Sequence, residues 1–326
     1  MADCCDVVLA GAAIIDVPVV PVDASVFTRG STPTGRIILT SGGDAMNEAL
    51  VLSRLGRRVR LVSRIGKDFA GAQLKHICAE AGMDMRYMAE VDGLDTGVNV
   101  VLVGSDGERR FLTNPHGSLR ALQAQDITPQ ALDGAKIFCF ASIFVFPRIT
   151  PQQLAHMFCM AREQGLLVCA DMTSPKRQET VSDLAPALRQ LDYFFANEEE
   201  ARQITGLTDA ADMAQVLLET GARHVIIKCG ARGCLIADHT GIQQIPACPD
   251  TDCIDTTGAG DSFAAGFLSA LLDGRDFADC ARYANACAAL SVEAVGASTG
   301  VTDAAQVLRR YQAAYADGCG QPCAVL

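Results

Sequence analysis

Short apolar runs alternate with amphipathic stretches along most of the chain. The runs that this pattern predicts as strands lie at residues 7–10, 58–66, 135–141, 166–171, 193–196 and 224–230. Helical periodicity follows at 69–82, from Thr150-Pro151 onward and around 213–220, and threonine before proline suits an N-cap and first turn. Alternation of strands and helices predicts an α/β fold: a mostly parallel sheet flanked by helices in three layers.

One part of the chain has the alternation of antiparallel strands instead. Residues 96–114 contain two alternating strands joined across Asp106-Gly107, a strong hairpin signal. Residues 35–43 form another extended piece. We predict a small β-sheet lid built from segments near 14–40 and 90–116. The whole of 1–312 then forms one domain, and 313–326 is expected to be a poorly ordered tail.

The stretch "DTTGAGDSF" (255–263) opens an apolar helix that Gly274 ends. Phe263, Phe267 and Leu268 share one helical face, so Gly258, Ala259 and Gly260 fall at the helix N-terminus. Free N–H groups and the helix dipole favour an anion there, and glycine lets a ligand approach the backbone.

Asp261 sits in this anion site, where a carboxylate would repel a bound phosphate. The conflict disappears if a second molecule lies beside the phosphate and Asp261 accepts a proton from its attacking hydroxyl. The alternative is an ordinary acidic residue that stabilises the first helical turn. No Walker A loop, HExxH or GxSxG motif is present, and "GAGDSF" lacks the third glycine of a dinucleotide fingerprint.

Charge and composition limit the classes of partner and the cellular location that we expect. The net charge of −11 argues against nucleic acid. No apolar stretch reaches the length of a membrane span, and the N-terminus lacks the basic region of a signal peptide, so we expect a cytoplasmic protein. The 14 cysteines are then expected to be reduced and largely buried. The terminal "CAVL" fits a prenylation box without an upstream polybasic segment, which favours chance.

Several motifs, in order, resemble the ribokinase-like (PfkB) carbohydrate kinases. "DTTGAGDSF" matches the signature D-T-x-G-A-G-D of that family, and "SGGDAMNEA" (41–49) matches G-G-x-x-x-N. "IGKDFAG" (65–71), "NEEEA" (197–201) and "KCGARGCLI" (228–236) resemble further family motifs. The resemblance covers about residues 5–310 and implies a ribokinase-like fold.

The resemblance also implies an activity and a set of site residues. It implies ATP-dependent phosphorylation of a primary hydroxyl of a sugar or sugar acid, with Asp261 as general base and the N–H groups of 258–260 as anion hole. Asp16 is expected on the sugar hydroxyls. Residues of the two lid strands are added as further candidates, so the expected substrate-binding residues are Asp16, Gly42, Gly43, Asn47, Asn99, Arg110 and Asn114.

Nucleotide and metal sites follow from the same resemblance. The expected nucleotide-binding residues are Asn197, Lys228, Gly230, Gly233, Thr256 and Asn285. Glu200 is expected to hold Mg²⁺ through water. A monovalent-cation (K⁺) site would use Asp255, Thr257, Ser291, Ala294, Gly296 and Gly300. Gly300 and Thr302 depart from the serine and proline of the family pattern, and "DMTSPKR" (171–177) departs from D-x-N-x-R.

Other functions stay open at this stage. A nucleoside kinase shares the fold and motifs, but the lid offers few aromatic residues for a base, Phe27 and Phe111. A non-catalytic nucleotide-binding regulator would be expected to lose Asp261 or Glu200, which this chain keeps. Arg109 and Arg110 are candidates to meet a carboxylate or phosphate on the substrate. Lids of this family often pair between subunits, so the resemblance implies a homodimer.

Overall fold

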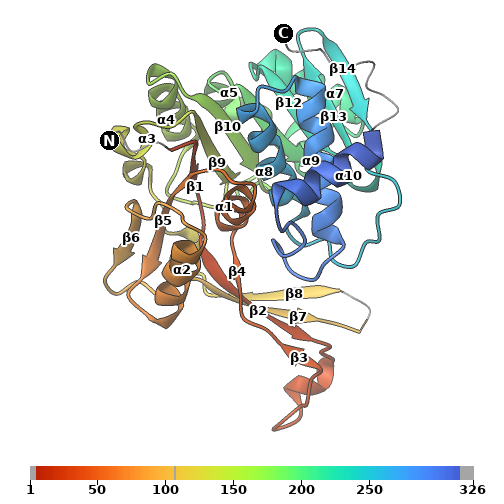
Figure 1. The fold of residues 1–326 in the computed structure, drawn as a ribbon. Coiled ribbons are helices and arrows are strands. Elements are labelled where there is room, and N and C mark those ends of the chain that lie inside the picture. The colour runs from red at the N-terminus through yellow and green to blue at the C-terminus, as the bar shows by residue number, and fades with distance from the viewer. Residues whose placement is uncertain (1–4, 106–107, 316–326) are drawn as a thin grey trace.

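A computed structural model describes residues 5–105 and 108–315 of this protein. A large sheet with helices on both faces carries a smaller sheet at one end (Figure 1). The large sheet has nine strands in the order β14-β13-β12-β11-β10-β9-β1-β5-β6. These strands span β1 Val7–Ala10, β5 Val59–Gly66, β6 Met88–Val91, β9 Ile137–Ile143, β10 Leu167–Met172, β11 Tyr193–Asn197, β12 His224–Lys228, β13 Cys234–Asp238 and β14 Gly241–Ile245.

The first seven of these strands in sequence are parallel, and only β13 and β14 pair antiparallel at one edge. Successive residues of a strand point to opposite faces. In β1, Val7 and Leu9 therefore join one apolar core, and Val8 and Ala10 join the other. Burial on both faces explains why these strands are continuous apolar runs in the sequence.

Each core is covered by its own set of helices. One face carries α1 Asp44–Arg54, α2 Phe69–Glu80, α8 Ala259–Leu272, α9 Phe277–Val292 and α10 Ala304–Tyr315. The other carries α3 Pro129–Leu132, α4 Pro151–Glu163, α5 Val181–Leu188, α6 Glu198–Thr205 and α7 Ala210–Thr220. Thr150 caps α4 as predicted, since its side chain accepts a hydrogen bond from the Gln153 N–H. The predicted three-layer α/β fold is confirmed.

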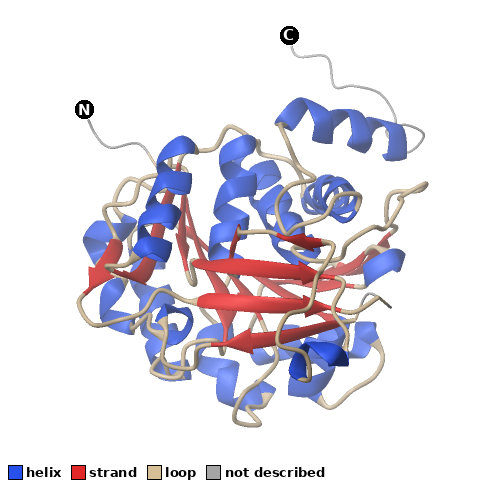
Figure 2. Ribbon diagram, turned by 90° about the horizontal axis from the view of Figure 1, so that it is seen from below, coloured by secondary structure: helices blue, strands red, loops and turns tan. Residues whose placement is uncertain are grey.

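The small sheet forms the predicted lid. It consists of β2 Ile14–Val20, β3 Arg36–Ile37, β4 Thr40–Gly42, β7 Val98–Val103 and β8 Arg109–Thr113. Seen from below, its long strands lie across the main domain (Figure 2). The β7–β8 pair is the predicted hairpin, although Asp106 and Gly107 of its turn lie outside the described residues. Residues 90–91 belong to β6 of the large sheet instead.

One boundary and the burial of one helix differ from the sequence prediction. Helix α10 continues to Tyr315, whose hydroxyl donates to the Pro246 carbonyl at 2.7 Å, so the folded part extends past 312. Residues 316–326, with the "CAVL" ending, lie outside the described range. Helix α8 does not bury one face only: residues 262–270 are all buried because α1 and α9 pack around it.

Helix length and cysteine burial are both defined in the described part of the chain. None of its helices is long and apolar enough to cross a membrane. Its cysteines are all free, and only Cys159 and Cys253 are not buried.

Candidate active site

The N-terminus of α8 is built for close approach of an anion. Gly258 has φ +72°, and a Cβ there would collide with the Ala297 carbonyl, so only glycine fits. The Ala259 N–H donates to the Thr256 carbonyl at 3.3 Å. Among the described residues, neither the Gly258 N–H nor the Gly260 N–H has a hydrogen-bond partner. Both donors are thus available to a ligand at the helix terminus.

Asp261 lies in the first turn of α8 and is held from a neighbouring helix. Asn47 of α1 donates its Nδ2 to Asp261 Oδ2 at 2.7 Å. The Asn47 side chain is buried, and its Oδ1 has no partner within the described structure. An unsatisfied buried acceptor is costly, so this oxygen is suited to accept a hydroxyl of a bound acceptor molecule.

The lid contributes a second carboxylate to the same side. Asp16 of β2 accepts a hydrogen bond from Asn99 of β7 at 3.1 Å, its cross-strand neighbour. The Asp16 carboxylate lies directly against Gly42, where any Cβ would overlap it. Gly43 has φ +91° and turns the chain into α1, bringing Asn47 toward the site. The structure therefore brings together five of the seven predicted substrate residues.

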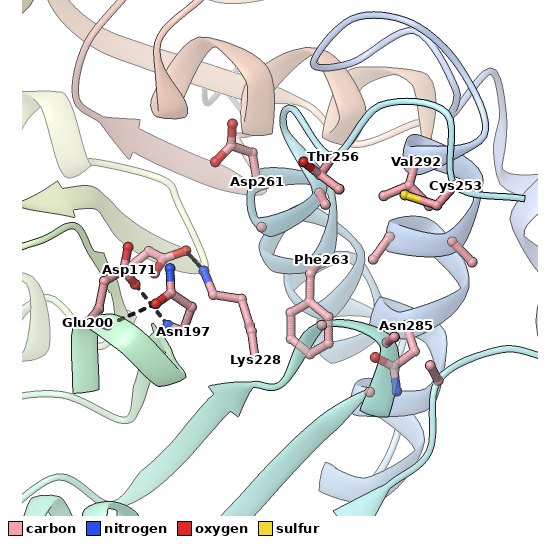
Figure 3. Close-up of a pocket in the computed structure, with 18 of the residues that line it drawn as sticks. Asp171, Asn197, Glu200, Lys228, Cys253, Thr256, Asp261, Phe263, Asn285 and Val292 are labelled. Carbon is pink, nitrogen blue, oxygen red and sulfur yellow. Dashed lines mark hydrogen bonds and ion pairs between the residues drawn. The ribbon is translucent and has the colours of Figure 1, made fainter. Parts of the chain in front are cut away.

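A pocket of about 640 Å³ extends from Asp261 between the large sheet and helices α8 and α9 (Figure 3). Charged side chains line one end: Asp44, Asp171, Glu200, Lys228 and Asp261. Phe263, Ala288, Val292 and the buried Asn285 line the other. A charged end and an apolar end suit the phosphates and the base of a nucleotide.

All six predicted nucleotide residues line this pocket: Asn197, Lys228, Gly230, Gly233, Thr256 and Asn285. Gly233 has φ +87°, and a Cβ there would collide with the Ile245 carbonyl. Asn285 donates its Nδ2 to the Pro246 carbonyl at 3.0 Å and so fixes the chain after β14 beside the pocket.

Lys228 is the one cation among the pocket-lining residues and lies against Gly260. Its Nζ forms an ion pair with Asp171 at 2.5 Å, and both side chains are largely buried. Burial alone would lower the pKa of Lys228, but Asp171 and Glu200 outweigh it and raise that pKa. The ammonium group is therefore charged beside Gly260 of the anion hole, and Figure 3 shows it paired with Asp171.

The carboxyl groups outnumber this cation, and the pKa values of several of them are raised. Burial raises the pKa of Asp44 to about 6 and that of Glu200 to about 7, although Lys228 opposes both shifts. Burial and Asp44 raise the pKa of Asp261 well above its ordinary value. A divalent cation beside these groups would stabilise their charged forms.

Magnesium fits this donor set if it arrives with phosphate oxygens and water. In the described ranges, no three Asp, Glu, His or Cys side chains are arranged to hold a metal directly. Mg²⁺ commonly keeps several waters and binds through one or two carboxylates plus phosphates. Glu200 is well placed for this, because its Oε2 accepts the Asn197 N–H at 2.8 Å and the side chain faces the pocket.

The loop before α8 is tied together by Asp255. Its Oδ1 accepts the Thr257 N–H at 2.8 Å, and its Oδ2 accepts the Gly296 N–H at 3.0 Å. Arg109 at the start of lid strand β8 donates to Asp255 and to the Thr257 hydroxyl. Burial would raise the pKa of Asp255, but these hydrogen bonds keep it below its ordinary value. Arg109 thus joins the lid to the anion-hole loop.

Two predicted substrate residues lie elsewhere. Arg110 alternates with Arg109 along β8, so it points to the opposite face of the lid, where it is exposed and pairs with Glu108. Asn114 follows the strand and accepts the His116 N–H at 2.9 Å. Arg109 faces the site, but it contacts the protein's own Asp255.

Sequence reasoning missed two carboxylates of the pocket. Asp44 occupies a variable position of the G-G-x-x-x-N motif, and Asp171 is the penultimate residue of β10. A carboxylate at the carboxyl end of a parallel strand is a signal that could have identified Asp171. Asp44 carried no such signal, since an acidic residue in a first helical turn is common.

Comparison with known proteins points to one family. The pfkB family carbohydrate kinase model matches residues 6–304. A nucleoside kinase of Methanothermobacter thermautotrophicus is 30% identical over 285 residues, covering 87% of this chain and 88% of the relative. A ribokinase of Haemophilus influenzae is 29% identical over 282 residues, covering 84% and 89%.

Solved structures share the fold. A putative ribokinase II from E. coli superposes with a TM-score of 0.82 at 21% identity, covering 94% of this chain and 99% of that one. The complex of a putative ribokinase II from E. coli with ATP and Mg²⁺ gives a TM-score of 0.79 at 21% identity, with the same coverage. Because the family model covers almost the entire described chain, this protein belongs to the PfkB family of ribokinase-like carbohydrate kinases.

Proposed function

We propose that this protein transfers the γ-phosphoryl group of ATP to a primary hydroxyl of a sugar or sugar acid. One observation carries the proposal: Asp261, held by Asn47, lies where the lid-side polar groups meet the charged end of the nucleotide pocket. Asp261 accepts the hydroxyl proton as general base. The free N–H groups of Gly258 and Gly260 and the Lys228 ammonium stabilise charge on the transferring group. Mg²⁺, when bound with ATP, adds charge neutralisation at the phosphates.

ADP release from Mg-ATP tests this proposal across free sugars, sugar acids, sugar phosphates and nucleosides. We expect turnover on sugars or sugar acids that the Asp261→Asn variant loses. Turnover on nucleosides alone would replace the proposed acceptor class. If ATP binds but no acceptor in the panel releases ADP, the result favours a non-catalytic regulator.

A nucleoside kinase is the second candidate. Phe111 shares the inner lid face with Arg109 by strand alternation and is 56% exposed, so a base could stack on it. Relatives named nucleoside kinase and cytidine kinase are 30% and 27% identical. The same panel separates the two candidates.

Two further parts of the expectation remain proposals. We propose a K⁺ site formed by Asp255, Thr257, Ser291, Ala294, Gly296 and Gly300. It is supported by the buried Ser291 hydroxyl, which has no partner among the described residues.

We also propose a homodimer through the lid. Large apolar side chains exposed on lid segments support it: Phe27, Ile37, Leu39 and Leu112.

The Arg109 contact predicts an effect on lid closure. Arg109→Ala should weaken acceptor binding by about 5–30-fold in KM, because a partly buried ion pair of this kind contributes about 1–2 kcal/mol. ATP hydrolysis without acceptor should rise, since the lid no longer excludes water as well. Steady-state kinetics measures both quantities.

A matched control separates this effect from loss of any arginine ion pair. Arg223 precedes β12, at the opposite end of that strand from Lys228, and pairs with Asp192 at 2.9 Å. Arg162 still contacts Asp192 after removal of Arg223. Arg223→Ala should leave KM and hydrolysis unchanged, and Arg109→Lys should restore part of the loss. Equal behaviour of the two alanine variants would contradict a closing role for Arg109.

A further inference from the structure

A second cavity lies beside the active site and shares no lining residue with the nucleotide pocket. It has a volume of about 350 Å³ and lies between the loop after β9 and the loop after β10. Arg120, in the short 3-10 helix that follows the lid, also lines it. This volume is within the range of small-molecule sites, about 300–1,000 Å³.

The floor of this cavity is apolar and preformed. Phe140 and Phe146 are buried and pack edge to face with ring centroids 5.8 Å apart. Leu154 of α4 is buried beside them. Buried aromatic rings in a fixed arrangement offer a surface for the apolar body of a ligand.

The rim of the cavity is basic. Arg120, Lys176 and Arg177 line it, and none of the three forms an ion pair within the described residues. The only lining carboxylate, Glu179, accepts the backbone N–H groups of Lys176 at 3.0 Å and Arg177 at 2.7 Å. It therefore fixes the loop through the backbone and forms no ion pair with either side chain, while the charge of Lys176 also acts on Asp44 of the nucleotide pocket and opposes the rise of its pKa. In a chain of net charge −11, three such cations at one cavity favour an anionic ligand.

Backbone strain is concentrated in the two loops of this cavity. Phe144 has φ +82° and Gln178 has φ +59°, and Ser142, near the end of β9, has φ +60°. A non-glycine residue in this region costs about 1–3 kcal/mol and is most often retained at functional sites. Arg177 donates to the Pro147 carbonyl at 2.8 Å and so joins the two strained loops across the cavity.

We infer that this cavity binds a small organic anion, an apolar body carrying a phosphate or carboxylate, and that its occupancy changes turnover at the neighbouring active site. Ser142, near the end of β9 and two residues before Phe144, lines the nucleotide pocket, and so does Thr173, the first residue of the second loop. A ligand that orders these loops would therefore act on both cavities. The anionic group could belong to a separate effector or to the far end of the acceptor itself.

Phenyl phosphate is a suitable probe, and benzyl alcohol is its neutral counterpart. Calorimetric titration uses the full chain saturated with ADP, so that the nucleotide pocket is filled. We expect saturable binding of phenyl phosphate with one site per chain and much weaker binding of benzyl alcohol. The double variant Arg120→Ala/Lys176→Ala should weaken binding by about 10-fold or more, because charge-assisted hydrogen bonds are lost.

The control removes two cations elsewhere. Lys75 and Arg223 lie in ion pairs away from this cavity, and the double variant Lys75→Ala/Arg223→Ala should bind the probe as the wild type does. Absence of saturable binding, equal binding of benzyl alcohol, or equal loss in both double variants would overturn the site. Because the binding measurement needs no turnover, its outcome does not depend on the proposed kinase activity.

Kinetics then distinguishes the two sources of the anion. A separate effector should change kcat or the KM for ATP without competing with a neutral acceptor. An acceptor subsite should instead show competition between phenyl phosphate and the acceptor, and the Arg120→Ala/Lys176→Ala variant should raise KM for anionic acceptors only. Binding that leaves every kinetic constant unchanged would overturn the coupling between the cavities.

Discussion

Replacing Asp261 with asparagine should lower kcat by about 10²–10⁴-fold, which corresponds to about 3–5 kcal/mol of transition-state stabilisation. Asparagine keeps the size of the side chain and can still accept from Asn47, which donates at 2.7 Å in the wild type. It cannot accept the hydroxyl proton. Rapid-quench or coupled ADP assays measure the loss, and near-native turnover would contradict the general-base role.

The stability of this variant provides its own control. Folding raises the pKa of Asp261, mainly through burial. A group with a raised folded pKa disfavours the folded state once pH exceeds its unfolded value, since its charged form is then the costly one. Asp261→Asn should therefore unfold at an equal or higher denaturant concentration at neutral pH. A loss of activity with retained stability assigns the effect to chemistry.

The pH profile should carry the same signature. Asp261, Asp44 and Glu200 all have raised pKa values, so kcat/KM of the wild type should rise with pH well above the ordinary range of an aspartate. Because these three groups interact, the rising part of the pH profile reports their combined titration and not that of Asp261 alone. Removal of Asp261 should make the residual activity rise less steeply over that range.

Lys228→Met should reduce both stability and turnover, and the two losses should separate. Removing one partner of the buried Lys228–Asp171 pair leaves an uncompensated carboxylate and should cost about 3–5 kcal/mol in the free energy of unfolding. Loss of a cation beside Gly260 should lower kcat by about 10²–10³-fold, the usual cost of removing one preorganised group that stabilises transition-state charge.

A second substitution distinguishes structure from catalysis at this position. Adding Asp171→Asn to Lys228→Met neutralises the carboxylate that Lys228 contacts directly. The double variant should therefore regain most of the lost free energy of unfolding, as measured by denaturant titration. Turnover should stay low, because the ammonium beside the anion hole is still missing. Recovery of kcat in the double variant would show that Lys228 serves only to neutralise Asp171.

Helix α8 shows how much of the structure a local sequence pattern can predict. The glycines, Asp261 and the apolar residues that follow predict a helix N-terminus with an anion site, and α8 begins at Ala259. The prediction depends only on neighbours in sequence, since free N–H groups and left-handed glycine geometry are local properties. The buried strands are equally local: apolar runs on both faces imply a covered parallel sheet.

Contacts between distant segments could not be predicted from local sequence patterns. Asn47 reaches Asp261 across 214 positions, and Arg109 reaches Asp255 across 146. Family resemblance placed Asn47 near the substrate. Arg110 was a candidate because of its charge and its place on the second lid strand, but strand alternation turns it to the outer lid face. A one-residue difference along a strand reverses the side chain, so the direction depends on how the lid packs.

The amino-acid sequence thus determined the α/β architecture, the lid and the anion-binding helix, because hydrophobic period, turn residues and glycine positions act over a few neighbours. Tertiary structure decided the charge balance of the active site. Asp44 and Asp171 meet Lys228 only because separate strands and helices end at the same edge of the sheet. Their raised pKa values and the basic second cavity arise from burial and from charges that the chain brings together only when folded.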